Sequence, residues 1–431
     1  IMSNKMTGYE EKIDEIKENL LANKNIILTG APGTGKTFMA KQIAKELGCE
    51  DDNIGFVQFH PSYDYTDFVE GLRPTDKDGN GNVGFERKDG VFKKFCERAL
   101  KNLVDSRKSA EEITKENDVK NLVNSFLNEI YENETKFKTS STENEFQIKS
   151  IDENFITISI PTKKKTSELK LSISDIHQIL LSDAKLEKVK DLISIFNRKN
   201  HRQEDSYLFV LCKEIREKQK IKSEITGKIP LKNFVFIIDE INRGEVAKIF
   251  GELFYSVDPG YRVTSDDLDA IKNGNKTVTT IKTQYANLET KGNEFDKALK
   301  STDYGHFFIP ENMYIIGTMN DIDRSVESMD FAFRRRFSWI EVKASDTVDM
   351  LYPSTNENGE STGLESKELA DEAKRRMDNL NAEISKIDGL NEAYHIGASY
   401  FLKLKNYNGD FESLWEYHIK GILQEYLRGS G

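Results

Sequence analysis

The stretch from Gly30 to Thr37 constrains this chain more than any other, because it fits the pattern G-x-x-x-x-G-K-[ST] in full. An apolar run over residues 25–29 precedes it and predicts a strand, and apolar residues at helical spacing follow it up to Gly48. Glycines at such a turn let successive backbone N–H groups face one anion, and the following helix adds the positive end of its dipole. This pattern predicts a strand, a triphosphate-binding loop and a helix.

Two side chains of the loop have expected roles in holding a nucleotide and its metal ion. Lys36 is expected to neutralise the β- and γ-phosphates, and the hydroxyl of Thr37 to ligate Mg²⁺. A glycine-rich turn without a ligand is the alternative, and the flanking strand and helix disfavour it. The predicted nucleotide contacts are Gly30, Ala31, Pro32, Gly33, Thr34, Gly35, Lys36, Thr37 and Phe38.

Four further apolar runs predict the other strands of a parallel sheet. They cover residues 54–60, 234–238, 314–319 and 337–342. The first two have the pattern of buried strands. Because the carboxyl ends of strands in an α/β sheet face the ligand crevice, we expect the polar residues that follow them to form the site. From about residue 365 the spacing turns helical to the end of the chain, which predicts a helical lid on the sheet.

Two acidic residues, Asp239 and Glu240, directly follow the second of these runs, which is the Walker B pattern. Mg²⁺ prefers oxygen ligands, so Thr37 and Asp239 are the predicted metal ligands, Asp239 either directly or through water. Glu240 is placed to orient or deprotonate the attacking water. Asn320 follows a neighbouring run, where a neutral amide can hold that water without repelling the γ-phosphate. Solvation of a strand end is the alternative for the acidic pair, and a plain turn residue is the alternative for Asn320.

Three consecutive arginines, at residues 334–336, precede the last predicted strand. Phosphoryl transfer needs a positive charge at the leaving phosphate oxygens, and a guanidinium supplies one that is always protonated. In a ring of subunits, this position would lie near the site of a neighbour. A surface patch is the alternative, and the position between a helix and a strand favours the functional interpretation.

Residues 108–228 have the pattern of an insertion that forms a small α+β module. Alternating apolar residues predict a β-hairpin over 145–151 and 155–160 and a third strand over 169–173. The segment has enough apolar residues to close a core of its own, which favours a folded module over a disordered linker. Helical patterns follow over residues 176–181, 186–196 and 207–215.

Two further motifs favour structural interpretations. Residues 79–84 fit G-x-G-x-x-G, but polar turn residues and not a strand precede them, so we interpret them as the tip of a hairpin and not as a dinucleotide fingerprint. Three lysines at 163–165 are more typical of a solvated loop than of a contact with phosphate or a partner.

Length and composition bound the remaining possibilities. A chain of 431 residues has room for two or three domains, and a net charge of −11 gives no general affinity for a polyanion. Cys49, Cys96 and Cys212 form no C-x-x-C pair, which disfavours a zinc site or a disulfide framework and suits a reducing cytoplasm. We expect no membrane span, because no apolar stretch is long enough. The two ends of the sequence leave room for a further domain.

Four segments together resemble the McrB family, the AAA+ GTPase motor of modification-dependent restriction systems. They are Asp-Glu-Ile-Asn-Arg at 239–243, Met-Asn-Asp-Ile-Asp-Arg-Ser at 319–325, Phe-Arg-Arg-Arg-Phe-Ser at 333–338 and Val-Gln-Phe-His-Pro-Ser-Tyr at 57–63. The second is the most diagnostic. This resemblance implies an AAA+ P-loop NTPase core with a parallel sheet, an inserted α+β module and a C-terminal helical lid. The implied domains are the core at 1–107 and 229–345, the insertion at 108–228 and the lid at 346–431.

The same resemblance implies a mechanism and partners. Asn320, Asp323 and Arg324 would belong to a signature loop near the catalytic water, and Arg335 and Arg336 would include the finger that reaches a neighbouring site. The implied assembly is a hexameric ring that hydrolyses GTP, with ATP as the alternative. It would drive DNA translocation by an endonuclease partner of the McrC type.

Two departures from the family pattern concern target recognition. The N-terminal DNA-reading domain of typical members is absent from this sequence, and more than a hundred residues replace a short link before the Walker B strand. DNA contact would then come through the partner, a missing N-terminal domain or the insertion. The alternative functions are a MoxR-like or dynein-related ATPase that remodels proteins, and an assembly platform gated by nucleotide.

Overall fold

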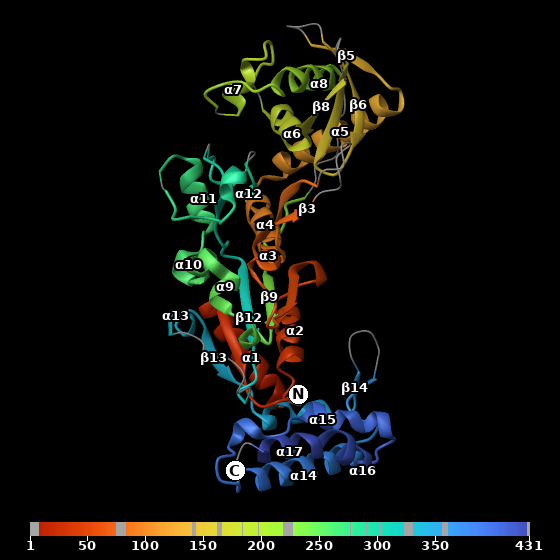
Figure 1. Cartoon of the computed structure of the whole chain (residues 1–431), viewed down its shortest axis with the longest axis vertical. Helices are drawn as coiled ribbons and strands as arrows, with labels where there is room; N and C mark the ends of the chain where they lie inside the picture. Colours follow the sequence, from red (N-terminus) through yellow and green to blue (C-terminus); the bar gives the residue numbers. More distant parts are fainter. Residues whose placement is uncertain are drawn as a thin grey trace, which may run out of the picture. The chain divides into compact units, whose positions relative to one another are not determined.

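The computed structural model divides the chain into two compact units (Figure 1). The core unit comprises Ile1–Leu103 and Leu231–Gly431, and the inserted unit comprises Val104–Pro230. The predicted insertion at 108–228 lies within the second range, and a separate lid from residue 346 stays a prediction. The structure describes residues 8–74, 83–139, 144–161, 166–182, 184–196, 198–218, 227–275, 277–289, 292–301, 303–322, 331–355 and 361–428.

A five-stranded parallel sheet forms the centre of the core unit, in the order β13-β1-β12-β9-β2. This sheet confirms the predicted α/β fold and all five predicted strands. The strand that leads to the phosphate loop lies between two others, which fixes both of its edges. The strands are β1 (Asn25–Thr29), β2 (Ile54–Gln58), β9 (Phe234–Asp239), β12 (Met313–Thr318) and β13 (Ser338–Glu341).

Helices cover both faces of this sheet, so successive side chains of a central strand enter different cores. Ile237 of β9 belongs to the cluster formed with the first two helices. Its neighbour Phe236 packs edge-on against Phe92, with 5.1 Å between ring centroids. Because both faces are buried, β9 and β12 are apolar along nearly their whole length. The helices concerned are α1 (Gly8–Asn23), α2 (Lys36–Glu46) and α4 (Val91–Ser106).

The prediction of a buried second strand was only partly right. β2 is the last strand in the order, so one of its edges is open, and the side chain of Phe56 remains 44% exposed. The ammonium of Lys41 lies 4.7 Å from the centre of that ring. An apolar run does not distinguish an edge strand from a central one, because both can be rich in aromatic residues.

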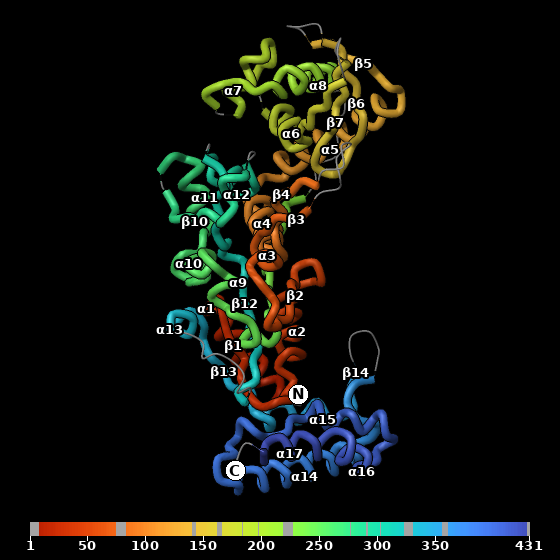
Figure 2. Tube along the Cα trace, viewed as in Figure 1, coloured from red at the N-terminus to blue at the C-terminus, as the bar shows by residue number. Residues whose placement is uncertain are grey.

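A hairpin follows β2. The short helix α3 (Tyr65–Phe68) leads into β3 (Glu70–Pro74), which pairs antiparallel with β4 (Phe85–Asp89) (Figure 2). The G-x-G-x-x-G motif lies at the connection of these two strands, in accord with a hairpin. Most of the motif falls outside the described residues.

Short elements connect β9 to β12 and β12 to β13, and most of them were not predicted from the sequence. The 3-10 turns are η2 (Ile241–Arg243), η3 (Gly251–Leu253), η4 (Pro259–Tyr261) and η5 (Ala286–Leu288). The helices are α9 (Val246–Phe250), α10 (Phe254–Val257), α11 (Ser265–Lys272), α12 (Glu294–Ala298) and α13 (Phe331–Arg334). The strands β10 (Ile281–Lys282) and β11 (His306–Phe307) pair with each other, and η1 (Asp51–Asn53) precedes β2.

The C-terminal part of the core unit is largely helical, as predicted, and has an apolar cluster of its own. Its longest helix starts after Ser366, whose hydroxyl accepts a hydrogen bond from the N–H of Leu369 and so caps the helix. The elements are η6 (Ala344–Leu351), β14 (Ser354–Thr355), β15 (Ser361–Thr362), α14 (Lys367–Ile384), η7 (Glu392–Tyr394), α15 (Ala398–Phe401), η8 (Leu402–Tyr407), α16 (Phe411–Leu414), η9 (Trp415–Ile419) and α17 (Lys420–Arg428).

The inserted unit is a four-stranded antiparallel sheet in the order β5-β6-β7-β8, packed on helices. The predicted hairpin and third strand are confirmed. The predicted helix over 186–196 is shorter, and the three-residue strand β5 was not predicted. The lysines at 163–165 lie outside the described residues. The elements are α5 (Ala110–Glu132), β5 (Lys136–Lys138), β6 (Glu145–Ile151), β7 (Phe155–Pro161), β8 (Thr166–Ser172), α6 (Ile173–Leu181), α7 (Asp191–Ile195) and α8 (Asp205–Lys218).

Two expectations from composition concern the whole chain. Cys49, Cys96 and Cys212 are free thiols, and all three are buried. Among the described helices, none combines the length and the apolar character that crossing a membrane requires.

Candidate functional site

The phosphate loop joins the end of β1 to the start of α2, in the predicted place. Gly30, Gly33 and Gly35 have φ angles of 141°, 77° and 78°, which residues other than glycine rarely adopt. A Cβ on Gly30 would lie 2.2 Å from the carbonyl oxygen of Val342. The glycines of the motif are therefore required by the backbone itself.

Lys36 projects its ammonium group among oxygen atoms of the loop. Its Nζ donates to the carbonyl oxygens of Gly30 and Ala31, at 3.0 and 2.8 Å, and to Oδ1 of Asn320 at 2.9 Å. The residue is only 6% exposed, and this burial lowers the pKa of Lys36 to about 8. The carboxylates of Asp321, Glu240 and Asp239 oppose that shift.

Two hydroxyl groups converge on the first carboxylate of the Walker B pair. The hydroxyls of Thr37 and Thr318 each donate to Oδ1 of Asp239, at 2.6 Å in both cases. These hard oxygen donors fit Mg²⁺, which keeps several water ligands and needs few from the protein. In the described ranges, no group of three or more His, Cys, Asp or Glu residues could hold a metal ion. Thr37 and Asp239 would therefore share the ion with water and phosphate.

Glu240 has an unusual backbone conformation directly after β9. Its φ and ψ angles, 51° and 45°, place it in the left-handed region, at a cost of about 1–2 kcal/mol for a residue with a Cβ. Such outliers cluster at functional sites, where the surrounding structure holds them. The amide of Asn320 donates to Oε1 at 2.8 Å, and Nε of Arg243 lies 3.3 Å from Oε2. The carboxylate is thus held in place from two sides.

Asn320 connects the phosphate loop to the Walker B carboxylate. Because an ammonium group can only donate, Oδ1 of Asn320 must face Lys36 and its Nδ2 must face Glu240. Nδ2 of Asn242 donates to the backbone carbonyl oxygen of Asn320 at 3.5 Å. The structure therefore brings Lys36, Glu240 and Asn320 into one network.

Thr318 is a site residue that was not predicted from the sequence. Besides donating to Asp239, its hydroxyl accepts a bond of 3.3 Å from the N–H of Glu240. It therefore supports the strained residue that follows β9. The signal in the sequence was a hydroxyl near the carboxyl end of an otherwise apolar run, two residues before Asn320.

The rest of the predicted signature loop is only partly visible. Asp323 and Arg324 lie outside the described residues, and their predicted roles stay predictions. Asp321 is described and exposed, and its N–H donates to the carbonyl oxygen of Gly30 at 3.4 Å. Desolvation of its carboxyl group raises the pKa of Asp321, and the nearby charge of Lys36 opposes this shift.

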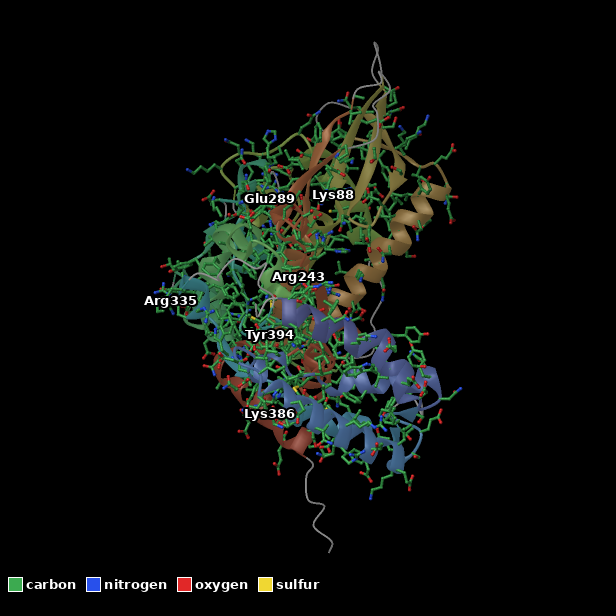
Figure 3. The ribbon with its side chains drawn as sticks, turned by 60° about the horizontal axis from the view of Figure 1, so that its bottom comes forward. Lys88, Arg243, Glu289, Arg335, Lys386 and Tyr394 are labelled. Carbon is green, nitrogen blue, oxygen red and sulfur yellow. The ribbon has the colours of Figure 1, made fainter. Side chains whose placement is uncertain are left out.

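The three arginines have different surroundings. The guanidinium of Arg334 lies over the ring of Trp339, 4.9 Å from its centre. That of Arg336 lies 4.3 Å from the centre of the Phe254 ring, and its Nη1 donates to the carbonyl oxygen of Ala332 at 2.8 Å. The side chain of Arg335 is exposed, and it makes no hydrogen bond or ion pair with any residue that the structure describes. Figure 3 labels it near the edge of the core unit.

These arginines lie at the opposite end of the sheet from the phosphate loop of the same chain. Ser338, the first residue of β13, pairs with Ile26 near the start of β1, and both strands run in the same direction. The phosphate loop begins only where β1 ends. Because a strand rises about 3.3 Å per residue, β1 separates the two features by about 16 Å. That distance exceeds the length of an arginine side chain.

The C-terminal helical part touches the phosphate loop through backbone groups. The N–H of Gly397 donates to the carbonyl oxygen of Pro32 at 3.2 Å, and that of Ser399 to Gly33 at 3.0 Å. A Cβ on Gly33 would lie 2.4 Å from the ring of Tyr400. The segment between η7 and α15 is not helical, and it makes this contact with the phosphate loop.

A phosphate loop after the first strand, an acidic pair after a neighbouring strand and a bridging asparagine define a P-loop nucleoside triphosphatase. The family model described as "AAA domain (dynein-related subfamily)" matches residues 25–176 and 190–337. The model described as "McrB, alpha-helical lid domain" matches residues 372–430. The chain therefore belongs to the AAA family. The match to the lid model supports the resemblance to the McrB family that the sequence motifs predicted.

Two curated proteins are similar to this chain. It is 26% identical to the "Type IV methyl-directed restriction enzyme EcoKMcrB subunit" of Escherichia coli K12 over 398 residues, which cover 91% of this chain and 50% of that protein. It is 32% identical to the "Type II restriction enzyme BsuMI component YdiS" of Bacillus subtilis over 108 residues, which cover 25% of this chain and 26% of that protein. The chain thus spans half the length of the first relative and about a quarter of the second.

Proposed function

We propose that this chain is the GTP-hydrolysing motor of a restriction system and that it acts as a ring, most simply a hexamer. In this proposal, hydrolysis drives DNA translocation and cleavage by an endonuclease partner of the McrC type. DNA contact would come through that partner, through a further domain or through the inserted unit. The chain would work with Mg²⁺ in the reducing cytoplasm, to which its three free thiols are suited.

One observation carries the proposal: the chain holds a complete phosphate loop at one end of its sheet and the exposed Arg335 at the other. Neither feature can serve the other within one copy, because the strand between them is too long. We call residues 334–336 the arginine turn. A second copy whose arginine turn faces the phosphate loop would complete the site. This geometry supports an oligomer in which each site uses residues of two subunits.

The chain's own residues supply the steps that precede bond cleavage. Lys36 would bind the terminal phosphates, and Thr37 and Asp239 would hold Mg²⁺, which supplies charge neutralisation there. Glu240 would accept the proton of the attacking water, and Asn320 would keep that carboxylate aligned with the ammonium of Lys36. Arg335 of the adjacent copy would stabilise the charge that develops on the phosphate oxygens.

The direct test of the hydrolytic site is Glu240→Gln, which preserves the size of the side chain and the bond from Asn320. We expect nucleotide binding and assembly to persist while turnover falls by about a hundredfold or more, because the general base is lost. The measurement is phosphate release per bound nucleotide. Full turnover in this variant would remove Glu240 from its proposed role, and assembly without any turnover in the unaltered chain would favour the platform alternative.

The direct test of the shared site mixes two inactive variants. Arg335→Ala keeps the phosphate loop but lacks the finger, and Lys36→Ala keeps the finger but lacks the ammonium. We expect each alone to have turnover at least a hundredfold lower, and the mixture to recover part of the activity at mixed interfaces. Arg334→Ala is the matched control, because that side chain stacks on Trp339 of its own chain. No recovery at any ratio would contradict the shared site.

The dynein-related match also admits a motor that remodels proteins with ATP. Comparing GTP and ATP turnover, with and without a co-encoded endonuclease, separates the two candidates. The restriction motor should prefer GTP and should be stimulated by the endonuclease. A preference for ATP together with indifference to the endonuclease would favour the remodelling machine.

A further inference from the structure

A buried amide at the amino end of β1 reaches the turn that carries Arg335. Asn25 is completely buried, and its Nδ2 donates to the carbonyl oxygen of Arg336 at 3.1 Å. The same Nδ2 donates to the carbonyl oxygen of Val257, the last residue of α10, at 2.7 Å. One side chain therefore ties α10 and the arginine turn to the central sheet.

Arg262 fixes the direction in which this amide points. Its Nη2 donates to Oδ1 of Asn25 at 2.5 Å, and its Nη1 donates to the carbonyl oxygen of Met313 at 3.1 Å. A guanidinium has no acceptor, so Oδ1 must face Arg262 and both N–H groups of the amide must face carbonyl oxygens. The buried pair of Asn25 and Arg262 thus has a single arrangement that satisfies it.

Other contacts hold the turn on both sides of Arg335. Nε1 of Trp339 donates to the carbonyl oxygen of Arg334 at 3.0 Å. Phe333 and Phe337 are buried and stack with their ring centroids 4.5 Å apart. The backbone before and after Arg335 is therefore anchored, while its own side chain is exposed.

We propose that Asn25, oriented by Arg262, is a positioning residue that sets where Arg335 meets the phosphate of an adjacent copy. The inference rests on the proposed function, because it gives Arg335 the role of a finger acting on another subunit. A displacement of about 1 Å at a group that contacts the transition state can lower the rate by about a hundredfold. Loss of the bond to Arg336 would permit such a displacement.

A competing role for Asn25 follows from its place in the chain. It begins the strand that ends at the phosphate loop, so the side chain could instead support nucleotide binding in its own subunit. The two roles predict opposite behaviour in mixed assemblies. A positioning residue for the finger impairs what its subunit gives to a neighbour, whereas a support for the loop impairs what its subunit receives.

Asn25→Asp is the variant that separates these roles. It keeps the size of the side chain and an acceptor for Arg262, but it removes both N–H donors. Asn312→Asp is the matched control. Asn312 is 4% exposed and directly precedes β12, at the same end of the sheet as Asn25. Its Nδ2 donates to the carbonyl oxygens of Ala99 and Lys232, both at 3.1 Å. The control therefore also leaves two backbone carbonyls without this donor, but neither carbonyl belongs to the arginine turn.

The experiment measures phosphate release by full-length variants, alone and in pairs, below their melting temperatures. Asn25→Asp alone should lose tenfold or more in kcat with its nucleotide KM unchanged, while Asn312→Asp should keep its kcat. Mixed with Lys36→Ala, Asn25→Asp should recover activity, because its intact loop meets an intact finger. Mixed with Arg335→Ala, it should recover none, because neither subunit supplies a positioned finger.

The reverse pattern, with recovery beside Arg335→Ala and none beside Lys36→Ala, would overturn the inference in favour of support for the loop. An unchanged kcat in Asn25→Asp would overturn it as well. If that variant does not fold, Arg262→Lys replaces it. The single nitrogen of lysine cannot occupy the positions of both Nη1 and Nη2, so this variant should give the same pairing pattern. Failure of Arg335→Ala and Lys36→Ala to complement each other refutes the shared site itself, which is a separate result.

Discussion

At the scale of single residues, the chemistry of the site depends on a charged group that is buried, where a charge is unfavourable unless it has hydrogen-bond partners. Lys36 is almost fully buried, and its ammonium is satisfied by two loop carbonyls and by Asn320. A bound phosphate oxygen is also an acceptor, so it would compete with these three oxygen atoms for the ammonium of Lys36. Binding a triphosphate would therefore exchange neutral acceptors for anionic ones around the same nitrogen atom.

This exchange predicts that nucleotide affinity depends on pH. Burial lowers the pKa of Lys36 to about 8 in the free protein, and a bound phosphate favours the charged form and raises it. Nucleotide affinity should be highest below pH 8 and should fall by up to about tenfold per pH unit as the pH rises through that value. Titrating a fluorescent nucleotide between pH 7 and 9.5 measures this slope.

Lys36→Arg is the control, because a guanidinium stays protonated over this range. The nucleotide affinity of this variant is expected to be weaker but independent of pH. The same slope in the arginine variant would assign the titration to another group.

Residue by residue, the sequence was most informative where a motif fixes both chemistry and backbone. Lys36, Thr37, Asp239, Glu240 and Asn320 meet as the motifs and strand ends predicted. What the sequence did not contain was the direction of a side chain. The sequence does not distinguish the three consecutive arginines. The contacts of Arg334 with Trp339 and of Arg336 with Phe254 and Ala332 leave Arg335 as the one whose side chain has no such contact with a described residue.

At the scale of elements, the strands of the sheet were predictable and their order was not. Continuous apolar runs identified β9 and β12 because both faces of those strands are buried. The edge position of β2 and the short elements between β9 and β12 depend on which segments lie side by side, and such pairings have no local signal. The contact between α15 and the phosphate loop belongs to the same class.

That contact leads to a prediction for Gly397. A Cβ at this position would lie 2.2 Å from the carbonyl carbon and oxygen of Gly33, so Gly397→Ala should force the helical part away from the loop. We expect faster amide exchange in residues 30–35 and at least a fivefold loss of nucleotide affinity. Hydrogen exchange and a nucleotide titration measure the two effects.

Gly421→Ala is the matched control in the same helical part. No atom lies within 4 Å of a Cβ added there, and alanine favours the helix α17 by about 0.5–1 kcal/mol. It should leave exchange in the loop unchanged. Equal effects of the two substitutions would mean that the contact between the two parts is not what the first one breaks.

At the scale of the whole molecule, the two units have separate cores. The inserted unit buries its own apolar cluster between its sheet and helices α5, α6 and α8, with Ile156 and Ile158 fully buried. Within the core unit, the chain segments on either side of the insertion meet, because the N–H of Lys232 donates to Oδ1 of Asn102 at 2.8 Å. The core unit thus needs only a short connection to close where the insertion leaves it.

We therefore expect both units to fold separately. Replacing residues 104–230 by a few glycine and serine residues should leave nucleotide affinity within about twofold, and the excised segment should unfold cooperatively on its own. In that segment, Ile158→Ala should lower the free energy of unfolding by about 2–5 kcal/mol, because it leaves a cavity in the apolar cluster of the segment. The same substitution in the full chain should leave nucleotide affinity unchanged.

Two outcomes would show that the two units form one folding unit: loss of nucleotide binding on excision, or an isolated segment without a cooperative transition. The insertion could then not be a separate docking module for DNA or for the partner.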